Sequence, residues 1–548
     1  MTVSTLLTEA LKARVRRPSL YPKLTTAKDL IASGIFKNGM RMGWSGFTGV
    51  GYPKETPVAL ADYVEKNNLQ DKLQFDLFVG ASTSPLVEDR WAKLGMIKRR
   101  YPYQTGKEIQ KKINRNEIAF ADKHLSEFPL DLVSGYYTLE KKGNVMEKLD
   151  IVLVEATAIT EEGHIIPGAS VGATPEIVQS ASKLVVEVNT FLPNFEGLHD
   201  ITLSRFAPYK FPNLIQRVDD RVGTPYIPID DDRIVALIES RHPDNTAESE
   251  PQDQTSHRIA DNILEFLAHE VTMDRLPNSL LPLQSGVGNI ANAIIGGLAD
   301  GPFNNVEVWT EVIQVLVDQL TKHYDIFLLS DTFLDFWEHH KLSFASATSV
   351  AFSPHGFKRF YDMWDDLKDR LVLRSQSVSN SPEVIRRLGV IAMNTPVEFD
   401  IYGHANSTHV CGTRMLNGLG GSADFLRNSK LSIMHTPSTR HTKKDPIGIS
   451  CVVPMCSHID HTEHDLDVYV TEQGLADIRG LSPIERARVI IDKCAHPDYR
   501  PILKDYLDFA ERKCLEIGAA HEPQLLDRVF KMHLNVMGEE NTMRIKGW

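Results

Sequence analysis

Segments with the pattern of buried strands alternate with segments of helical periodicity along most of the 548-residue chain. Residues 40–48 and 73–79 are apolar segments that end in loops of Gly and other small residues, and a helical pattern lies at 57–67. Residues 149–159 and 183–188 are typical of buried strands. Because parallel strands need long crossover connections, the alternation predicts an α/β protein with mostly parallel sheets.

The same alternation restarts after a polar stretch between residues 225 and 254, which is rich in Pro, Asp, Asn and Ser. Beyond it, helices are expected at 257–267 and 290–298. Polar stretches that contain Pro commonly join domains. We therefore predict two α/β domains, residues 1–235 and residues 236–548.

Composition excludes several classes of protein. The chain has 60 Lys and Arg against 72 Asp and Glu, a formal net charge of −12, and such an acidic protein repels the phosphates of nucleic acids. It contains no apolar stretch of ~18 residues, so no transmembrane helix is expected. The five cysteines form no CxxC pair, which argues against a disulfide framework or a zinc ribbon and favours a reducing compartment.

The N-terminal segment, residues 2–20, has four basic residues, several Ser and Thr, and one acid. Its apolar residues fall at helical spacing, as in a mitochondrial presequence. An ordinary first helix with a basic end explains the pattern equally well. We expect a mitochondrial protein, with the cytoplasm as the alternative.

The first candidate site is a glycine loop at residues 286–291, GVGNIA, which matches the pattern GxGxxA. Glycines let backbone amides approach a phosphate or an oxyanion, and the following helix offers its positive N-terminus. Pro282 makes the preceding segment a poor central strand, so the loop is a weak dinucleotide fingerprint. It fits a general anion or oxyanion loop better, and a turn needed only for packing is the remaining alternative.

Two further motifs are weaker. Ser170 lies in a GxSxG match at residues 168–172, but the surroundings are so rich in Ala, Ser and Gly that a chance match is favoured over a nucleophile elbow. Residues 458–465 hold three His and three acids, with a spacing that fits no common zinc pattern. We interpret them as a polar or pocket-lining loop and predict no metal site.

The remaining candidate is Glu311, which lies among apolar residues in the segment 306–314. A partly buried carboxylate is costly unless it is paired or used. Glu311 follows the glycine loop by one helix and one connection, so a strand–loop–helix–strand path can place both at one edge of a parallel sheet.

At these residues the sequence resembles the acetyl-CoA hydrolase/transferase family. The segments that carry the resemblance are Gln284–Asn292, Trp309–Gln314, Asp400–His409, Asn417–Phe425 and Val470–Gly480. The match spans nearly the whole chain. It implies two α/β domains of the CoA-transferase type and a ping-pong mechanism.

The resemblance also assigns roles to residues. Glu311 would be the nucleophile that attacks an acyl-CoA thioester and then becomes a glutamyl-CoA thioester, with the backbone amides of Val287 and Gly421 as oxyanion donors. The residues expected at the oxyanion and CoA sites are Gly286, Val287, Gly288, Asn289, Ile290, Asn417 and Gly421, together with Asn380 and Gly420 near the bound CoA.

One departure from the family pattern lies directly after this segment. About sixteen extra residues, 315–330, separate Gln314 from the segment that begins at Asp331. They are either a local insertion or a translated intron, since a valine codon can supply the starting GT and the Phe-Leu-Leu end fits a pyrimidine-rich tract. Sequencing the transcript distinguishes the two.

We therefore expect an enzyme that transfers CoA between succinyl-, acetyl- or propionyl-CoA and a short carboxylate such as acetate, with acetyl-CoA hydrolysis as a side or additional activity in acetate metabolism. CoA is a substrate, no cofactor is tightly bound, and a homodimer is expected. The alternatives are a nicotinamide-dependent oxidoreductase that uses the Gly286 loop, and an acyl-CoA sensor without turnover. The residues select neither the acyl group nor the balance of hydrolysis and transfer.

Overall fold

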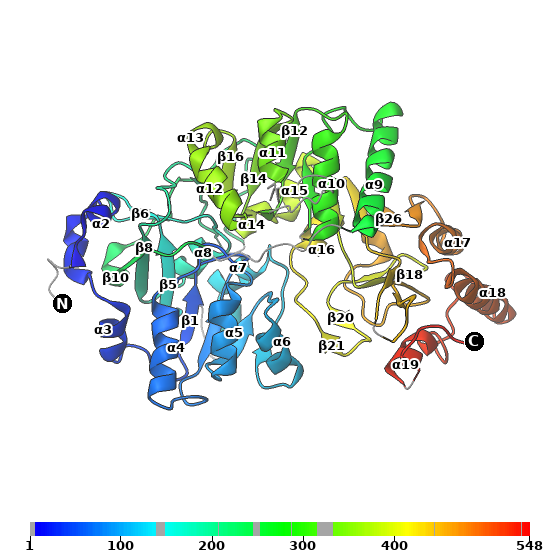
Figure 1. Cartoon of the computed structure of the whole chain (residues 1–548), viewed down its shortest axis with the longest axis horizontal. Coiled ribbons are helices and arrows are strands. Elements are labelled where there is room, and N and C mark those ends of the chain that lie inside the picture. Colours follow the sequence, from blue (N-terminus) through cyan, green and yellow to red (C-terminus); the bar gives the residue numbers. More distant parts are fainter. Residues whose placement is uncertain are drawn as a thin grey trace, which may run out of the picture. The chain divides into compact units, whose positions relative to one another are not determined.

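The computed structural model describes residues 6–138, 148–205, 208–244, 253–286, 288–314, 332–442, 444–538 and 540–548 (Figure 1). The chain forms two compact units. The first unit comprises Met1–Glu248, Val308–Val315 and Ser343–Leu388, and the second comprises Ser249–Glu307, Leu316–Leu342 and Gly389–Trp548. The extra segment 315–330 lies outside the described residues.

The first unit is built on a seven-stranded sheet in the order β10-β8-β5-β1-β2-β3-β4, in which every neighbouring pair is parallel. The strands are β1 (Arg41–Trp44), β2 (Phe75–Phe78), β3 (Ile97–Tyr101), β4 (Ala119–Phe120), β5 (Ile151–Ala156), β8 (Leu184–Asn189) and β10 (Ile234–Ser240). Its crossover helices include α4 (Thr56–Lys66), α5 (Pro85–Lys93), α6 (Lys107–Asn114) and α8 (Thr174–Gln179). Figure 1 shows α4 and α5 alongside the strands.

Sequence patterns and structure agree closely in this sheet. Every residue of β5 and β8 is buried, as expected for strands that are covered on both faces of a parallel sheet. The helix expected at 57–67 is α4, and the apolar segment 73–79 contains β2. The predicted α/β class with mostly parallel sheets is confirmed.

The first unit also contains three shorter parallel strands in the order β14-β16-β9. They are β9 (His199–Asp200), β14 (Leu342–Ala347) and β16 (Leu371–Arg374). A separate parallel pair joins β13 (Val312–Gln314) to β15 (Ser349–Ala351). The helices that follow are α12 (Pro354–Asp362), α13 (Trp364–Leu367), α14 (Gln376–Ser379) and α15 (Pro382–Leu388).

The second unit contains neighbouring strands in the order β27-β26-β22-β17-β11. They are β11 (Leu283–Ser285), β17 (Ile391–Asn394), β22 (Leu431–His435), β26 (Val468–Thr471) and β27 (Gly474–Asp477), of which β27 alone runs antiparallel to its neighbour. Its larger helices are α9 (Gln254–Thr272), α10 (Asn289–Asp300), α16 (Ser422–Asn428), α17 (Pro483–Cys494) and α18 (Arg500–Glu516). The helices expected at 257–267 and 290–298 are α9 and α10.

The remaining elements are short. They are α2 (Glu9–Arg14), η1 (Pro18–Lys23), α3 (Ala27–Ala32), α7 (Phe128–Val133), η2 (Tyr136–Thr138), β6 (Ala158–Ile159), β7 (Ile165–Ile166), η3 (Asp231–Arg233), β12 (Val306–Trp309), α11 (Thr332–Glu338), β18 (Glu398–Asp400), β19 (Ala405–Asn406), β20 (His409–Val410), β21 (Arg414–Met415), β23 (Thr439–Arg440), β24 (Ile449–Ser450), β25 (Val452–Val453), η4 (Glu463–Asp465) and α19 (Lys531–Met537).

The expectation that Pro282 spoils the following segment as a strand is wrong. Residues 283–285 form β11 and pair in parallel with β17. Pro282 stands just before the strand, and its carbonyl accepts a hydrogen bond from the amide of Ile391 at 2.9 Å. A proline at this position removes no donor that the strand needs.

The two compact units differ in their bounds from the predicted domains, residues 1–235 and residues 236–548. Residues 308–315 and 343–388 belong to the first unit, because the chain returns to it after α9 and α10. The single boundary at residue 235 stays a prediction about domains.

The N-terminal segment is packed into the first unit. Leu11 and Val15 are fully buried, and the Arg14 guanidinium donates to the carbonyls of Thr157 at 2.9 Å and Leu192 at 2.7 Å. The segment contains the helix α2 (Glu9–Arg14), and the two interpretations of its basic composition stay predictions. Among the described helices, none is long and apolar enough to cross a membrane.

Candidate active site

Glu311 lies in the first unit, in the turn between β12 and β13. Its backbone carbonyl accepts hydrogen bonds from the amides of Thr348 at 2.9 Å and Ser349 at 3.1 Å. These bonds fix the backbone of Glu311 at the start of the β13–β15 pair. Glu311 is half-buried.

The carboxylate of Glu311 is held by Asn380. The Asn380 amide nitrogen Nδ2 donates to Glu311 Oε1 at 2.6 Å, and the Asn380 side chain is fully buried. Asn380 is the C-cap residue of α14, and the preceding Ser379 accepts a hydrogen bond on its carbonyl from Trp309 Nε1 at 2.7 Å. One end of α14 thus fixes both β12 and the carboxylate that follows it.

Tyr103 lies close enough to Glu311 for the charge of that carboxylate to affect its pKa. Burial raises the pKa of the Tyr103 hydroxyl, and the negative charges of Glu311 and Asp122 raise it further. The Tyr103 hydroxyl therefore stays neutral and can donate a hydrogen bond. No pattern in the sequence points to Tyr103, since it comes close to Glu311 only in the folded first unit.

Loops that follow strand ends meet near this turn. A Cβ atom on Gly80 would lie 2.8 Å from the amide nitrogen of Ala173 and 2.9 Å from Gln376 Oε1, so only glycine fits there. Gly172 has a φ of +53° and donates its amide to Thr348 Oγ1 at 3.0 Å. The loops after β2, β14 and β16 therefore all contact residues 172–173, which precede α8. The Gly- and Ser-rich composition of these loops is the feature of the sequence from which their contact could have been predicted.

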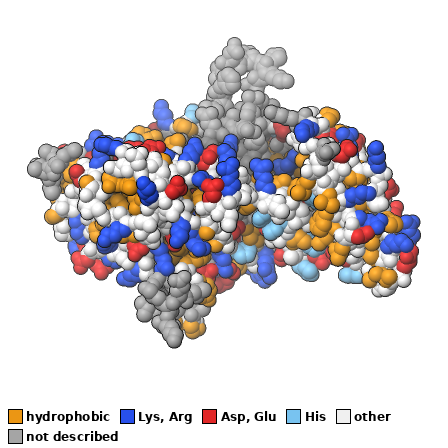
Figure 2. Space-filling model, turned by 90° about the horizontal axis from the view of Figure 1, so that it is seen from below, with side chains coloured by type: hydrophobic (Ala, Val, Ile, Leu, Met, Phe, Trp, Pro, Cys, Tyr) orange, Lys and Arg blue, Asp and Glu red, His pale blue; other side chains and the backbone are white. Residues whose placement is uncertain are grey.

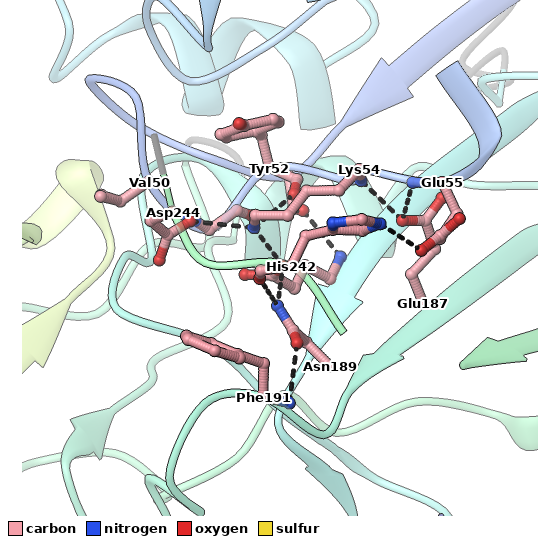
Figure 3. A network of polar contacts seen from close by, with 12 residues as sticks. Val50, Tyr52, Lys54, Glu55, Glu187, Asn189, Phe191, His242 and Asp244 are labelled. Atoms are coloured by element: carbon pink, nitrogen blue, oxygen red, sulfur yellow. Dashed lines mark hydrogen bonds and ion pairs between the residues drawn. The ribbon is translucent and has the colours of Figure 1, made fainter. Parts of the chain in front are cut away.

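Behind these loops lies a buried network around Lys54 (Figure 3). The Lys54 ammonium forms ion pairs with Glu155 and with Asp244 Oδ1, the latter at 2.9 Å, and it also donates to the Tyr52 carbonyl at 3.1 Å. Asn189 Nδ2 donates to Glu155 Oε2 at 3.0 Å. All three charged side chains are buried, and each offsets the cost of burying the charge of its partner.

The pKa values of this network follow from burial and charge. Burial raises the pKa of Glu155 to about 7, with Lys54 opposing the rise and Asp244 adding to it. Burial alone would lower the pKa of Lys54, but the negative charges of Asp244 and Glu155 outweigh it and raise that pKa. Lys54 therefore carries its charge throughout the physiological range.

The network fixes the loop of residues 46–51, which follows β1. Asp244 Oδ1 accepts a hydrogen bond from the Gly51 amide at 3.0 Å. Glu187 accepts from the amides of Lys54, Glu55 and Thr56 at 2.6, 2.8 and 2.7 Å, and so caps the start of α4. Figure 3 shows Glu187 pointing at this helix start, and His242 turned toward Glu55.

Ser170 belongs to the same framework. Its hydroxyl is buried and donates to the Val50 carbonyl at 2.9 Å, and its backbone bridges to Ser349. The hydroxyl therefore braces the 46–51 loop, which supports the interpretation of the GxSxG match as a chance match.

The Gly286 loop lies in the second unit. Gly286 follows β11 and donates its amide to the Met393 carbonyl at 2.8 Å. Gly288 is the N-cap residue of α10, with a φ of +127° that L side chains rarely adopt. Asn289 and Ile290 form the first turn of α10. Val287 lies outside the described residues.

The second glycine loop, residues 417–421, precedes α16 in the same unit. Asn417 Nδ2 donates to the carbonyls of Ser407 at 3.2 Å and Gly418 at 2.8 Å. Gly420 has a φ of +66°, and Gly421 is the N-cap residue of α16. Since α10 follows β11 and α16 precedes β22, both helices begin at the carboxyl edge of the parallel strands β11, β17 and β22.

The histidine-rich segment 458–465 is held by local hydrogen bonds. His461 Nε2 lies 3.0 Å from Ser407 Oγ and 3.2 Å from Ser422 Oγ. Asp460 accepts from the Ser407 amide at 2.7 Å. Within the described residues, the group of His, Cys, Asp or Glu that converges as metal ligands would is Asp230, Asp231 and Asp232, at a distant point of the chain. The hydrogen bond to Ser422 places this segment beside the second glycine loop, and the expected absence of a metal site stays a prediction.

The surface in Figure 2 has Lys and Arg side chains interspersed with Asp and Glu, and hydrophobic patches between them. This face shows no continuous basic stripe of the kind that binds a phosphate backbone.

Comparisons with known proteins match this chain over nearly its whole length. Residues 9–239 match the acetyl-CoA hydrolase/transferase N-terminal domain and residues 356–507 match the corresponding C-terminal domain. Acetyl-CoA hydrolase from Neurospora crassa is 58% identical over 99% of both chains. Acetyl-CoA hydrolase from Saccharomyces cerevisiae is 54% identical over 100% of this chain and 99% of its own.

Solved structures of low sequence identity share the fold. RipA from Yersinia pestis superposes with a TM-score of 0.65 at 18% identity, covering 95% of this chain and 100% of its own. A 4-hydroxybutyrate CoA-transferase from Porphyromonas gingivalis superposes with a TM-score of 0.58 at 20% identity, covering 90% and 99%. Together with the two family domains and the curated relatives, these matches show that the chain is an enzyme of the acetyl-CoA hydrolase/transferase family.

Proposed function

We propose that this enzyme transfers CoA between an acyl-CoA and a short carboxylate such as acetate, through a thioester on Glu311, and that it also hydrolyses acetyl-CoA. The observation that carries the proposal is the Glu311 carboxylate at the end of β12, half-buried and bound by Asn380 at 2.6 Å. A carboxylate that is oriented in this way is a competent nucleophile toward a thioester carbonyl.

The reaction proceeds in four balanced steps. A Glu311 oxygen attacks the acyl carbonyl and the CoA thiolate leaves, which produces a mixed anhydride. The thiolate then attacks the Glu311 carbonyl carbon and releases the donor's carboxylate, leaving glutamyl-CoA. An acceptor carboxylate attacks this thioester and again displaces the thiolate. The thiolate finally attacks the acceptor's acyl carbon, forming the new acyl-CoA and restoring the Glu311 carboxylate.

Backbone amides and the CoA contacts complete the proposal. Each step passes through a tetrahedral oxyanion, which we assign to the amides of Val287 and Gly421 as donors. Gly286, Gly288, Asn289, Ile290, Asn417 and Gly420 would contact CoA together with Asn380. Neutral donors of this kind allow a protein of net charge −12 to bind polyanionic CoA.

Hydrolysis differs from transfer only in the group that resolves glutamyl-CoA. Water in place of the carboxylate gives free CoA and the Glu311 carboxylate. Succinyl-, acetyl- and propionyl-CoA are the proposed donors, and no tightly bound cofactor enters any step. The curated relatives named acetyl-CoA hydrolase support the acetyl-CoA activity.

The test is to trap the thioester. Enzyme treated with acetyl-CoA and then with borohydride should carry a reduced side chain at Glu311, detected by mass on the peptide that contains it. Glu311→Ala should lose both transfer and hydrolysis, while the control Glu265→Ala, an exposed residue of α9, should keep both. Full transferase activity in Glu311→Ala would refute the assignment.

We also propose that the enzyme is a mitochondrial homodimer whose N-terminal segment is retained. The basic composition of residues 2–20 supports the location, and the burial of Leu11 and Val15 supports retention, since cleavage after them would remove core residues. N-terminal sequencing of the protein from purified mitochondria tests this: a mature chain that begins beyond Val15 contradicts it.

A further inference from the structure

The first unit contains a cavity of about 430 Å³ that the proposed reaction does not use. Six of its lining residues are apolar: Leu203, Phe211, Pro212, Leu214, Val222 and Val378. Five of these six leave a large share of their surface to solvent, with Phe211 68% and Leu214 73% exposed. A cavity of this size with apolar walls is typical of sites for small ligands.

Two cations lie on the same lining. Arg205 and Lys210 face the cavity, and within the described part of the chain neither forms an ion pair. The Arg205 guanidinium lies 4.7 Å from the centre of the Phe211 ring, which holds it at the apolar wall. Cations beside an apolar cavity select a ligand that has both an anionic group and an apolar body.

Hydrogen bonds that range from buried to exposed tie the lining segments to the rest of the first unit. Glu176, fully buried, accepts from Ser204 Oγ and Ser377 Oγ, each at 2.7 Å. Asp200 Oδ1 accepts from the Val222 amide at 3.0 Å. Arg387 donates to the Asn213 carbonyl at 2.7 Å. Each of the cavity's segments is thus bonded to a strand or helix of the first unit.

One wall is α14 itself. Ser377 and Val378 line the cavity, and two residues further on Asn380 donates to Glu311. A ligand that contacts this helix acts on the residue that holds the carboxylate. This consequence for Glu311 rests on the proposed function, whereas binding to the cavity does not.

We propose that this cavity is a binding site for a small amphipathic anion, a hydrocarbon body with one carboxylate or phosphate group, and that its occupation rigidifies α14. Arg205 and Lys210 bind the anionic group, and the six apolar side chains cover the body.

The test uses octanoate and octyl phosphate as probes, with 1-octanol as the neutral analogue, titrated calorimetrically into the full-length protein below micelle-forming concentrations. At least one anion should bind, and the variant Arg205→Gln/Lys210→Gln should weaken it about tenfold or more. The control Lys98→Gln/Lys183→Gln removes two exposed charges elsewhere in the first unit and should bind as the wild type does. Binding of octanoate alone identifies a carboxylate site, and binding of octyl phosphate alone identifies a phosphate site.

Hydrogen exchange tests the effect on α14. The amides of Ser379 and Asn380, which donate to Ser375 and Gln376, should exchange more slowly when the anion binds, in the wild type but not in Arg205→Gln/Lys210→Gln. The proposal is overturned if neither anion binds, if the double variant binds as tightly as the wild type, if 1-octanol binds equally well, or if exchange at α14 is unchanged. Glu311→Ala should bind the probe normally, so failure of the proposed reaction leaves these results standing.

Discussion

Replacing Lys54 by Met should destabilise the first unit because it leaves two buried carboxylates without their counter-ion. Lys54 Nζ contacts Glu155 and Asp244, and the side chains of all three are 4% exposed or less. Removing one partner of a buried ion pair costs about 3–5 kcal/mol. Met retains the length of the side chain, so the loss reports on charge rather than on a cavity.

The measurement is native-state hydrogen exchange at the amides of β5, which gives the opening free energy of the first unit alone. The variant Lys54→Met/Glu155→Gln/Asp244→Asn should recover most of the loss, since it buries no charge at this point. Lys111→Met is the matched control: it removes a lysine that is 60% exposed and pairs with Glu108 at 2.6 Å, and it should leave the exchange of β5 unchanged.

The loss should depend on pH. The pKa of Glu155 is about 7 in the folded protein, above its ordinary value of 4.5, so its contribution to stability is greatest at low pH and is lost as the pH rises through 7. Without Lys54 the buried Glu155 carboxyl is favoured in its protonated form, so Lys54→Met should lose less stability at about pH 5.5 than at about pH 8. A loss that is independent of pH, or equal in the triple variant, would refute the role given to charge.

Three further predictions concern single residues. Asn380→Ala should lower kcat/KM for acetyl-CoA about tenfold or more, because it removes the donor to Glu311 Oε1; unchanged kinetics would contradict this role. Gly172→Ala should cost about 1–2 kcal/mol in urea unfolding, and more than Gly34→Ala: both glycines have a left-handed φ, +53° and +73°, but a Cβ on Gly172 would lie 3.1 Å from the Gly46 carbonyl, whereas one on Gly34 meets open space. Burial lowers the pKa of His199 to about 4 from its ordinary 6.5, so this residue should cost stability as the pH falls from 6.5 to 4; His199→Asn, compared by urea unfolding, should lose less over that range, and parallel pH profiles would contradict it.

The sequence predicted those parts of the fold whose signals are local. The apolar runs of β5 and β8 and the periodicity of α4, α9 and α10 lie within single segments, so each element could be recognised by itself. The error at β11 has the same origin: a proline was judged by its presence, whereas its effect depends on whether it falls before or inside the strand.

The site was predictable only in part, because its contacts join distant residues. Glu155 lies in a segment with the pattern of a buried strand, but nothing in the sequence pairs it with Lys54 and Asp244, and only the fold buries the three together. Glu311 was a candidate from its apolar surroundings, whereas its role and Asn380 came only from the family resemblance, and their hydrogen bond spans 69 positions of the chain. The periodicity of a single segment cannot predict a contact between residues 69 positions apart.

The discontinuous first unit has a consequence for biosynthesis. Its last described segment ends at Leu388, so about seven tenths of the chain must leave the ribosome before α14 can hold Glu311. The seven-stranded sheet is complete much earlier, at β10, and can form while the rest is still being translated. The scaffold is thus made first and the nucleophile is added late, so a truncated nascent chain can fold the seven-stranded sheet without acquiring reactivity.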